Sequence, residues 1–132
     1  MTYPLILVCV GSALGGGMRF LVAQGMLRLL GSSFPWGTWI VNVTGSYLIG
    51  LAMYLALNSA GFSQNLRVFL TTGVMGGLTT FSTFNYETIE LVRSGNLLLG
   101  GINLAGTVVL CLIAGILGLG TGRAWLGGAA LQ

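Results

Sequence analysis

The sequence contains no histidine, no lysine and no aspartate, and its charged residues are five arginines and two glutamates. Charged residues make up 5% of the 132 positions, whereas soluble domains usually carry about 25%. A chain of this length has a large surface for its volume. So few charges cannot cover that surface in water, and we therefore expect lipid to surround most of the chain.

The same shortages exclude several classes of function. The net charge of +3 is too small and too scattered for a nucleic-acid surface. The two cysteines, Cys9 and Cys111, are too few for a disulfide framework, and there is no histidine to complete a zinc site. An enzyme is the least expected class, because both acids, Glu87 and Glu90, lie near the end of one hydrophobic segment.

Four hydrophobic segments are long enough to cross a membrane, which requires roughly 20 apolar residues. They cover residues 4–30, 36–57, 66–91 and 97–119. We predict an all-α integral membrane protein with one four-span domain over residues 1–125 and a disordered tail over 126–132. No basic region precedes the first segment, so we expect a retained span rather than a cleaved signal peptide.

The arginines give this topology almost no preferred orientation. Arg67 and Arg123 fall on the side of the N-terminus, whereas Arg28 and Arg93 fall on the opposite side. Arg19, within the first segment, adds to the second side if its side chain extends that way. Because the arginine and lysine asymmetry of short loops sets orientation, both orientations are expected. An antiparallel homodimer with its two-fold axis in the membrane plane follows as a hypothesis.

Pairs of small residues four positions apart recur along the four segments. They are Gly11 with Gly15, Ser46 with Gly50, Gly73 with Gly77, and Gly118 with Gly122. Such pairs let helices approach closely in lipid. The pattern predicts close helix packing without saying which pairs lie between two copies of the chain.

The third hydrophobic segment has two glycines and two threonines at its centre. Adjacent glycines weaken a helix and threonines offer competing hydrogen bonds, so we predict a break within residues 76–80. Two such breaks facing each other across a two-fold axis could hold a dehydrated monovalent cation with their freed carbonyl oxygens. An unbroken glycine-rich packing face is the alternative.

Phe81 and Phe84 follow the break and are spaced to share one helix face. The edge of a phenylalanine ring is electropositive, so the two rings can face an anion without supplying a fixed charge. Ser82 and Thr83 add hydroxyl donors beside them. Packing against lipid or core is the ordinary alternative for two phenylalanines in a span.

The second and fourth segments contain isolated polar residues. Asn42 is an amide deep in the second segment, and Asn103 and Thr107 form a narrow polar stripe on the fourth. Neutral donors suit an anion pathway, because conduction requires binding that an ion can leave. Polar packing between helices remains the alternative for all three residues.

Three motifs together resemble the Fluc (CrcB) fluoride channels: GGGMRF at residues 15–20, NVTGS at 42–46 and GGLTTFSTF at 76–84. The resemblance covers the length, span count and motif order of the chain, and the third motif is the most specific. It implies a dual-topology antiparallel homodimer with two pores. Such a channel passively exports fluoride across the cell membrane of a microbe and relieves fluoride toxicity.

The resemblance also implies roles for individual residues. Phe81, Phe84 and Asn42 correspond to the pore residues of the family. The carbonyls of Gly76 and Thr79 correspond to the ligands of a central structural sodium ion, which is not transported.

Other positions correspond less clearly to the family pattern. Asn103 and Thr107 fall on the polar track of the fourth span, although Asn103 replaces the tyrosine often found there. Arg19 is expected to support an aqueous vestibule. Glu87 occupies an acidic position of the family to which we assign no role.

Two rival classes give different expectations. A four-span multidrug exporter of dual topology requires an acid within the first span, and the first hydrophobic segment here contains none. A non-transporting membrane scaffold would use the glycines and polar residues only for packing, and it predicts no ion flux from the purified protein.

Overall fold

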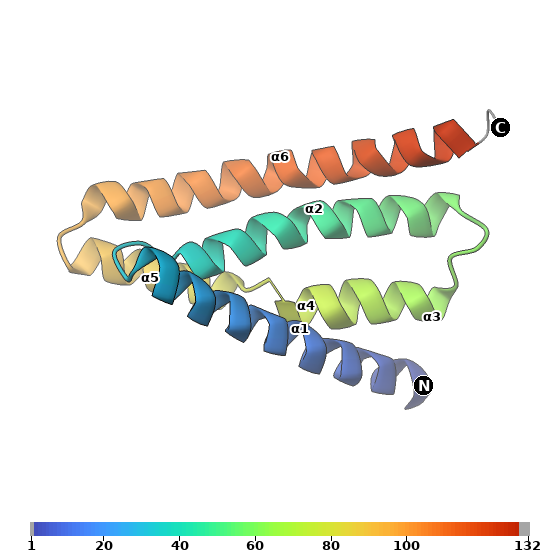
Figure 1. Ribbon diagram of the computed structural model, residues 1–132, viewed down its shortest axis with the longest axis horizontal. Helices are drawn as coiled ribbons and strands as arrows, with labels where there is room; N and C mark the ends of the chain where they lie inside the picture. The colour runs from blue at the N-terminus through green and yellow to red at the C-terminus, as the bar shows by residue number, and fades with distance from the viewer. Residues whose placement is uncertain (1, 130–132) are drawn as a thin grey trace.

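The computed structural model describes residues 2–129, and all regular elements within this range are helical. Their order is α1 (Thr2–Leu30), α2 (Trp36–Asn58), α3 (Gln64–Arg67), the π-helix η1 (Val68–Met75), α4 (Gly76–Leu78), α5 (Phe81–Arg93) and α6 (Leu97–Ala129). In the described range, α1, α2 and α6 are each long and apolar enough to cross a membrane. The third hydrophobic segment is divided among α3, η1, α4 and α5, as Figure 1 shows.

The predicted break in the third segment is confirmed, and it lies at Thr79 and Thr80. Both residues have extended backbone, with φ −119° and ψ 116° at Thr79 and φ −128° and ψ 112° at Thr80. Branching at Cβ makes threonine well suited to extended backbone. The glycines before it, Gly76 and Gly77, remain helical in α4, so the threonines rather than the glycines leave the helix.

An eight-residue π-helix precedes the break, which the sequence did not lead us to expect. π-Helical turns are rare and are frequent at functional sites. Gly73 lies within η1, and its carbonyl accepts a 3.4 Å hydrogen bond from Ser12 Oγ of α1. The π-helix therefore lies where α1 packs against the third segment.

The small-residue pairs of the sequence pack within a single chain, and Gly11 with Gly15 meets the segment that carries Gly73 with Gly77. A Cβ added to Gly11 would lie 2.8 Å from Gly73 Cα, and one added to Gly77 would lie 2.9 Å from Ser12 Cα. In the same way, a Cβ on Gly118 would lie 2.9 Å from the backbone nitrogen of Leu51. Close packing is confirmed, and it joins α1 to the third segment and α2 to α6.

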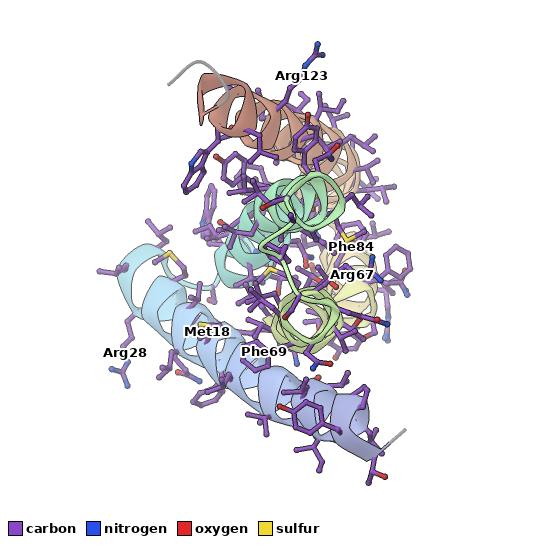
Figure 2. The ribbon with its side chains drawn as sticks, turned by 90° about the vertical axis from the view of Figure 1, so that its right-hand side faces the viewer. Met18, Arg28, Arg67, Phe69, Phe84 and Arg123 are labelled. Atoms are coloured by element: carbon purple, nitrogen blue, oxygen red, sulfur yellow. The ribbon has the colours of Figure 1, made fainter. Side chains whose placement is uncertain are left out.

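The helices run back and forth along one long axis (Figure 1). The N-terminus, the loop between α2 and α3, and the C-terminal end of α6 lie at one end of the molecule. Arg67 and Arg123 therefore share this end, whereas Arg28 and Arg93 belong to the other; Figure 2 labels the first three of these side chains. The arrangement agrees with the four-span topology that was used to assign two arginines to each side of the membrane.

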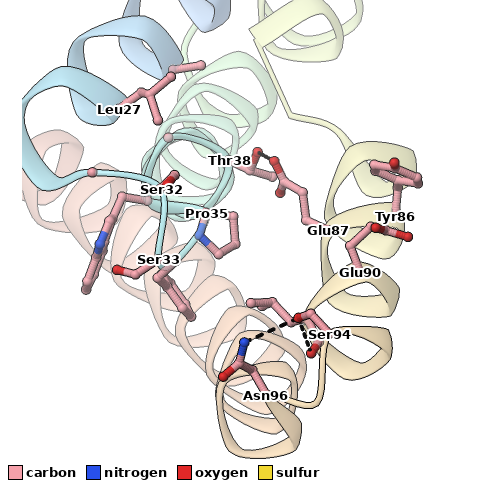
Figure 3. A pocket seen from close by; sticks show the side chains of 16 residues that line it. Leu27, Ser32, Ser33, Pro35, Thr38, Tyr86, Glu87, Glu90, Ser94 and Asn96 are labelled. Carbon is pink, nitrogen blue, oxygen red and sulfur yellow. Dashed lines mark hydrogen bonds between the residues drawn. The ribbon is translucent and has the colours of Figure 1, made fainter.

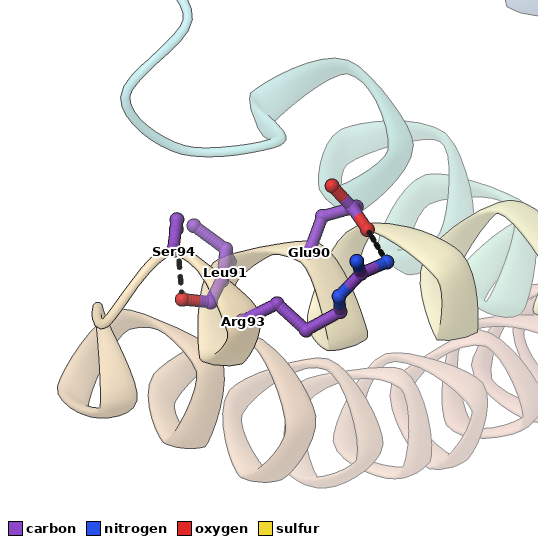
Figure 4. Close-up of polar contacts among 4 residues, drawn as sticks. All are labelled: Glu90, Leu91, Arg93 and Ser94. Carbon is purple, nitrogen blue, oxygen red and sulfur yellow. Dashed lines mark hydrogen bonds and ion pairs between the residues drawn. The ribbon is translucent and has the colours of Figure 1, made fainter.

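Arg93 is the one of these arginines that forms an ion pair among the described residues. Its Nη1 atom lies 3.1 Å from Glu90 Oε1 one turn earlier in α5, as Figure 4 shows. Both side chains are well exposed, and exposed pairs of this kind contribute little to stability. The pair nonetheless reduces the positive charge at this end of the molecule.

Helix α6 is longer than the predicted fourth span. Helix α6 continues to Ala129, well past the expected end of the span at residue 119. Residues 126–129 of the predicted disordered tail are thus helical, and residues 130–132 lie outside the described range. Glycines weaken a helix by about 1 kcal/mol each. The sequence after residue 119 contains no proline, however, and its leucine and alanine residues favour helix.

Candidate functional site

The break is held by a side chain of the neighbouring helix α2. The backbone N–H of Thr80 donates to Asn42 Oδ1 at 2.8 Å, and Asn42 Nδ2 donates to the carbonyl oxygen of Thr80 at 3.3 Å. Both residues are buried. The amide of Asn42 thus pairs with Thr80 as a neighbouring strand would. It satisfies the Thr80 N–H, which no helical bond satisfies, and it adds a second donor to the Thr80 carbonyl, which also accepts from Phe84 N–H at 3.4 Å.

Two carbonyl groups lose their helical partners as a result. In a continuous helix, Thr80 N–H would donate to the carbonyl of Gly76 and Thr83 N–H to the carbonyl of Thr79. Instead, Thr80 N–H donates to Asn42, and Thr83 N–H donates to Thr80 Oγ1 at 3.3 Å. The carbonyls of Gly76 and Thr79 are the pair expected to bind sodium, and oxygen atoms are suitable ligands for such a hard cation.

The hydroxyls after the break form one connected group at the start of α5. Thr80 Oγ1 lies 3.0 Å from Thr83 Oγ1 and 3.3 Å from Ser82 Oγ. Thr80 is the N-cap of α5, because its Oγ1 accepts from Thr83 N–H. Ser82 and Thr83 are exposed on the surface of the chain, so their hydroxyls remain accessible to a group outside it.

The two phenylalanines are neighbours but have different surroundings. Their ring centroids lie 5.7 Å apart with the planes inclined at 54°. Phe81 is 78% exposed, whereas Phe84, labelled in Figure 2, is 4% exposed. The structure thus brings the two rings together as the spacing predicted, with Phe84 within the chain and Phe81 projecting from it.

The polar stripe of α6 faces α5 rather than Asn42. Asn103 is 1% exposed, and its Nδ2 atom donates to Thr88 Oγ1 at 2.9 Å, while Thr107 Oγ1 donates to Asn103 Oδ1 at 3.4 Å. Thr88 Oγ1 in turn donates to the carbonyl of Phe84 at 2.7 Å. Sequence reasoning missed Thr88, because nothing in its local pattern shows that it faces α6.

Replacing Asn103 with leucine is expected to lower the free energy of unfolding by about 1 kcal/mol, because the hydrogen bonds of Asn103 to Thr88 and Thr107 are both lost. The matched variant Thr107→Val should cost less, since its 3.4 Å bond is longer. Unfolding of the purified protein in detergent, followed by circular dichroism, measures both values. A larger loss for Thr107→Val would contradict the order of the two contacts.

A cavity of about 570 Å³ opens at the end of the molecule where α1 meets α2 and α5 meets α6. Figure 3 shows Thr38, Glu87 and Glu90 among its lining side chains. Thr38 Oγ1 donates to Glu87 Oε1 at 2.9 Å, and Glu87 Oε2 is buried with no hydrogen-bond partner among the described residues. The half-buried Arg19 lies on α1 outside this lining, so its vestibule role stays a prediction.

Fold and site together define a small helical membrane protein. Its first, second and fourth spans are unbroken, and its third span is interrupted by an uncharged polar break. The family model described as CrcB-like protein, Camphor Resistance (CrcB), matches residues 6–119. The chain therefore belongs to the CrcB family, a family of bacterial multi-pass membrane channels rather than of enzymes. The resemblance inferred from the three motifs is thereby confirmed.

Curated relatives extend over most of the chain and carry the name fluoride-specific ion channel FluC. The protein of Anaeromyxobacter sp. (strain K) is 50% identical over 110 residues, which are 83% of this chain and 87% of the relative. The protein of Geobacter sulfurreducens is 46% identical over 109 residues, 83% of this chain and 88% of the relative. The protein of Clostridium novyi (strain NT) is 42% identical over 118 residues, 89% and 92% of the two chains.

Proposed function

We propose that this chain is a fluoride channel that passively exports fluoride from the microbial cytoplasm and relieves fluoride toxicity. The names of its relatives support fluoride as the transported ion. The observation that carries the proposal is the polar break in the third span, where the buried Asn42 and Thr80 and the exposed residues after the break offer amide and hydroxyl donors and aromatic ring edges without a fixed charge. Such donors bind an anion weakly enough for it to leave.

The exposed residues that flank the break support assembly with a second copy of the chain. Gly76, Ser82, Thr83 and Asn85 are exposed on one chain alone, although they flank a break in a membrane span. Irregular backbone at membrane depth requires a covering of protein or a water-filled cavity. An antiparallel homodimer with two pores provides that covering, and the balanced arginines allow both orientations.

The same dimer supplies a place for a structural sodium ion that is not transported. The carbonyls of Gly76 and Thr79 from each chain would hold it, because their helical partners are engaged elsewhere. A sodium ion bound there would supply positive charge beside these carbonyl oxygens. The chain itself keeps the Gly76 and Thr79 carbonyl oxygens free of helical hydrogen bonds.

We assign the ion pathway to residues near the break and on α6. Phe81 and Phe84 offer ring edges, and Asn42 retains one N–H after its bond to Thr80. Ser82, Thr83, Asn103 and Thr107 complete the set of neutral polar groups. The order in which an ion meets them is set by the dimer.

Proteoliposomes containing the purified protein are expected to release fluoride well above the rate of empty liposomes, measured with a fluoride electrode. Chloride release from the same vesicles, measured with a chloride electrode, is the matched control and should remain close to background. A fluoride release no greater than that of empty liposomes would contradict the channel and favour a non-transporting scaffold. Comparable fluoride and chloride release would contradict selectivity alone.

A further inference from the structure

Asn42 directs both polar ends of its side chain to one residue of the break. The carbonyl oxygen of its amide accepts from Thr80 N–H, and its amino group donates to the Thr80 carbonyl. We propose that Asn42 is a positioning residue that sets the backbone of the break, in addition to its place beside the ion. This deepens the proposed function, on which its consequences for sodium and fluoride rest.

The turn of α2 that follows Asn42 packs closely against the break. Gly45, one turn further along the buried face, leaves room for the Thr79 side chain, whose Cγ2 occupies the space where a Cβ on residue 45 would lie. Ser46 Oγ donates to the backbone carbonyl of Asn42 at 2.7 Å, so the Ser46 hydroxyl is engaged within α2 itself. One turn of α2 therefore contacts both extended residues.

Two acceptors compete for Thr80 N–H. If the helix continued, this group would donate to the Gly76 carbonyl, and that carbonyl would no longer be free for a cation. Asn42 provides an acceptor at 2.8 Å, so the N–H is satisfied without helical backbone at Thr80. Removal of the amide leaves the break with a buried unsatisfied N–H or returns it toward helix, and either change disturbs the carbonyl geometry.

The Asn42 amide has enough hydrogen-bonding groups to contact both the break and an anion, and it thereby links the two ion sites. An asparagine amide has one carbonyl oxygen and two N–H donors. The oxygen and one N–H are engaged with Thr80, so one N–H remains for an anion. The residue thus contacts the backbone that frees the carbonyls and can still donate to fluoride.

The test compares Asn42→Ala with Asn42→Asp. Aspartate keeps an oxygen that accepts from Thr80 N–H and loses only the donor to the Thr80 carbonyl, which still accepts from Phe84 N–H at 3.4 Å. Hydrogen exchange of the Thr80 amide is followed by NMR in the assembled protein, with the buried Ala114 amide of α6 as reference. We expect exchange at Thr80 to rise about tenfold or more in Asn42→Ala, through loss of a buried hydrogen bond. It should stay near the wild-type rate in Asn42→Asp.

Sodium binding and fluoride release complete the test. Radioactive sodium should bind about tenfold more weakly to Asn42→Ala and nearly normally to Asn42→Asp, while fluoride release falls in both because aspartate adds negative charge to the pathway. Unchanged Thr80 exchange in Asn42→Ala together with lost fluoride release would overturn the positioning role. If that variant does not assemble, rapid Thr80 exchange in Asn42→Asp would overturn it instead.

The two proposals fail in different ways in this design. A wild-type protein that binds no sodium would refute the structural cation, and one that releases no fluoride would refute the channel. In either case the Thr80 amide still decides whether Asn42 positions the break, because that measurement requires neither ion.

Discussion

Phe81→Ile is expected to reduce fluoride release from proteoliposomes at least tenfold while the protein still assembles. Isoleucine is apolar and fits a membrane surface, but it lacks the electropositive ring edge that can face an anion. Phe81 is 78% exposed on the single chain, so its replacement leaves no cavity in the core. A loss of flux would therefore report on the pathway rather than on folding.

The matched control is Phe20→Ile, which makes the same change at an exposed phenylalanine of α1 that is remote in sequence from the break. Flux through Phe20→Ile should remain close to wild type. Size-exclusion chromatography checks that both variants assemble equally. Normal fluoride release by Phe81→Ile would mean that its ring does not line the pathway.

The same substitution at Phe84 has a second effect. This ring is 4% exposed, so a smaller side chain leaves unfilled space in the packed interior. Reduced flux in Phe84→Ile therefore mixes a change in the pathway with a loss of stability. For this reason Phe81 is the more informative of the two positions.

Gly15→Ala is expected to destabilise the protein by about 1–3 kcal/mol or more, because a single methyl group does not fit at this position. Its Cβ would lie 2.5 Å from the backbone nitrogen of Leu78 and 3.0 Å from the carbonyl carbon of Gly77. Backbone atoms cannot move aside as the end of a flexible side chain does. Helix α1 must therefore separate from the third segment, and the break loses its support on that side.

Gly17→Ala provides the control for this prediction, since an added Cβ meets nothing within 4 Å. Alanine also favours helix over glycine, so this variant should be as stable as the wild type or slightly more stable. Thermal unfolding in detergent, with the yield of assembled protein, measures both variants. Equal unfolding temperatures for the two variants would refute the close contact of α1 with the third segment.

Much of the fold could be predicted because membrane spans are encoded locally. Scarce charge and long apolar runs require lipid, and span length follows from bilayer thickness. The break was also predictable, because a cluster of Gly and Thr weakens a helix wherever it occurs. The end of α6 was not predictable in the same way, since helix ends depend on weak and distributed preferences.

The site was predictable as a list of residues but not as an arrangement. The sequence placed Asn42, Phe81 and Asn103 among candidates for an ion pathway from their chemistry. It did not show that Asn42 binds the backbone of Thr80, since the two residues lie 38 positions apart. Nor did it show that Asn103 bonds to Thr88 across α5 and α6.

The sequence by itself determined that this protein lies in a membrane, spans it four times and interrupts its third span, because hydropathy and backbone preference act over neighbouring residues. Only the tertiary structure decided that the glycine pairs are used within one chain, that Phe84 is buried while Phe81 projects, and that Asn42 secures the break. These outcomes depend on which helix faces meet. That choice is made by close packing and by the need to satisfy every buried backbone group.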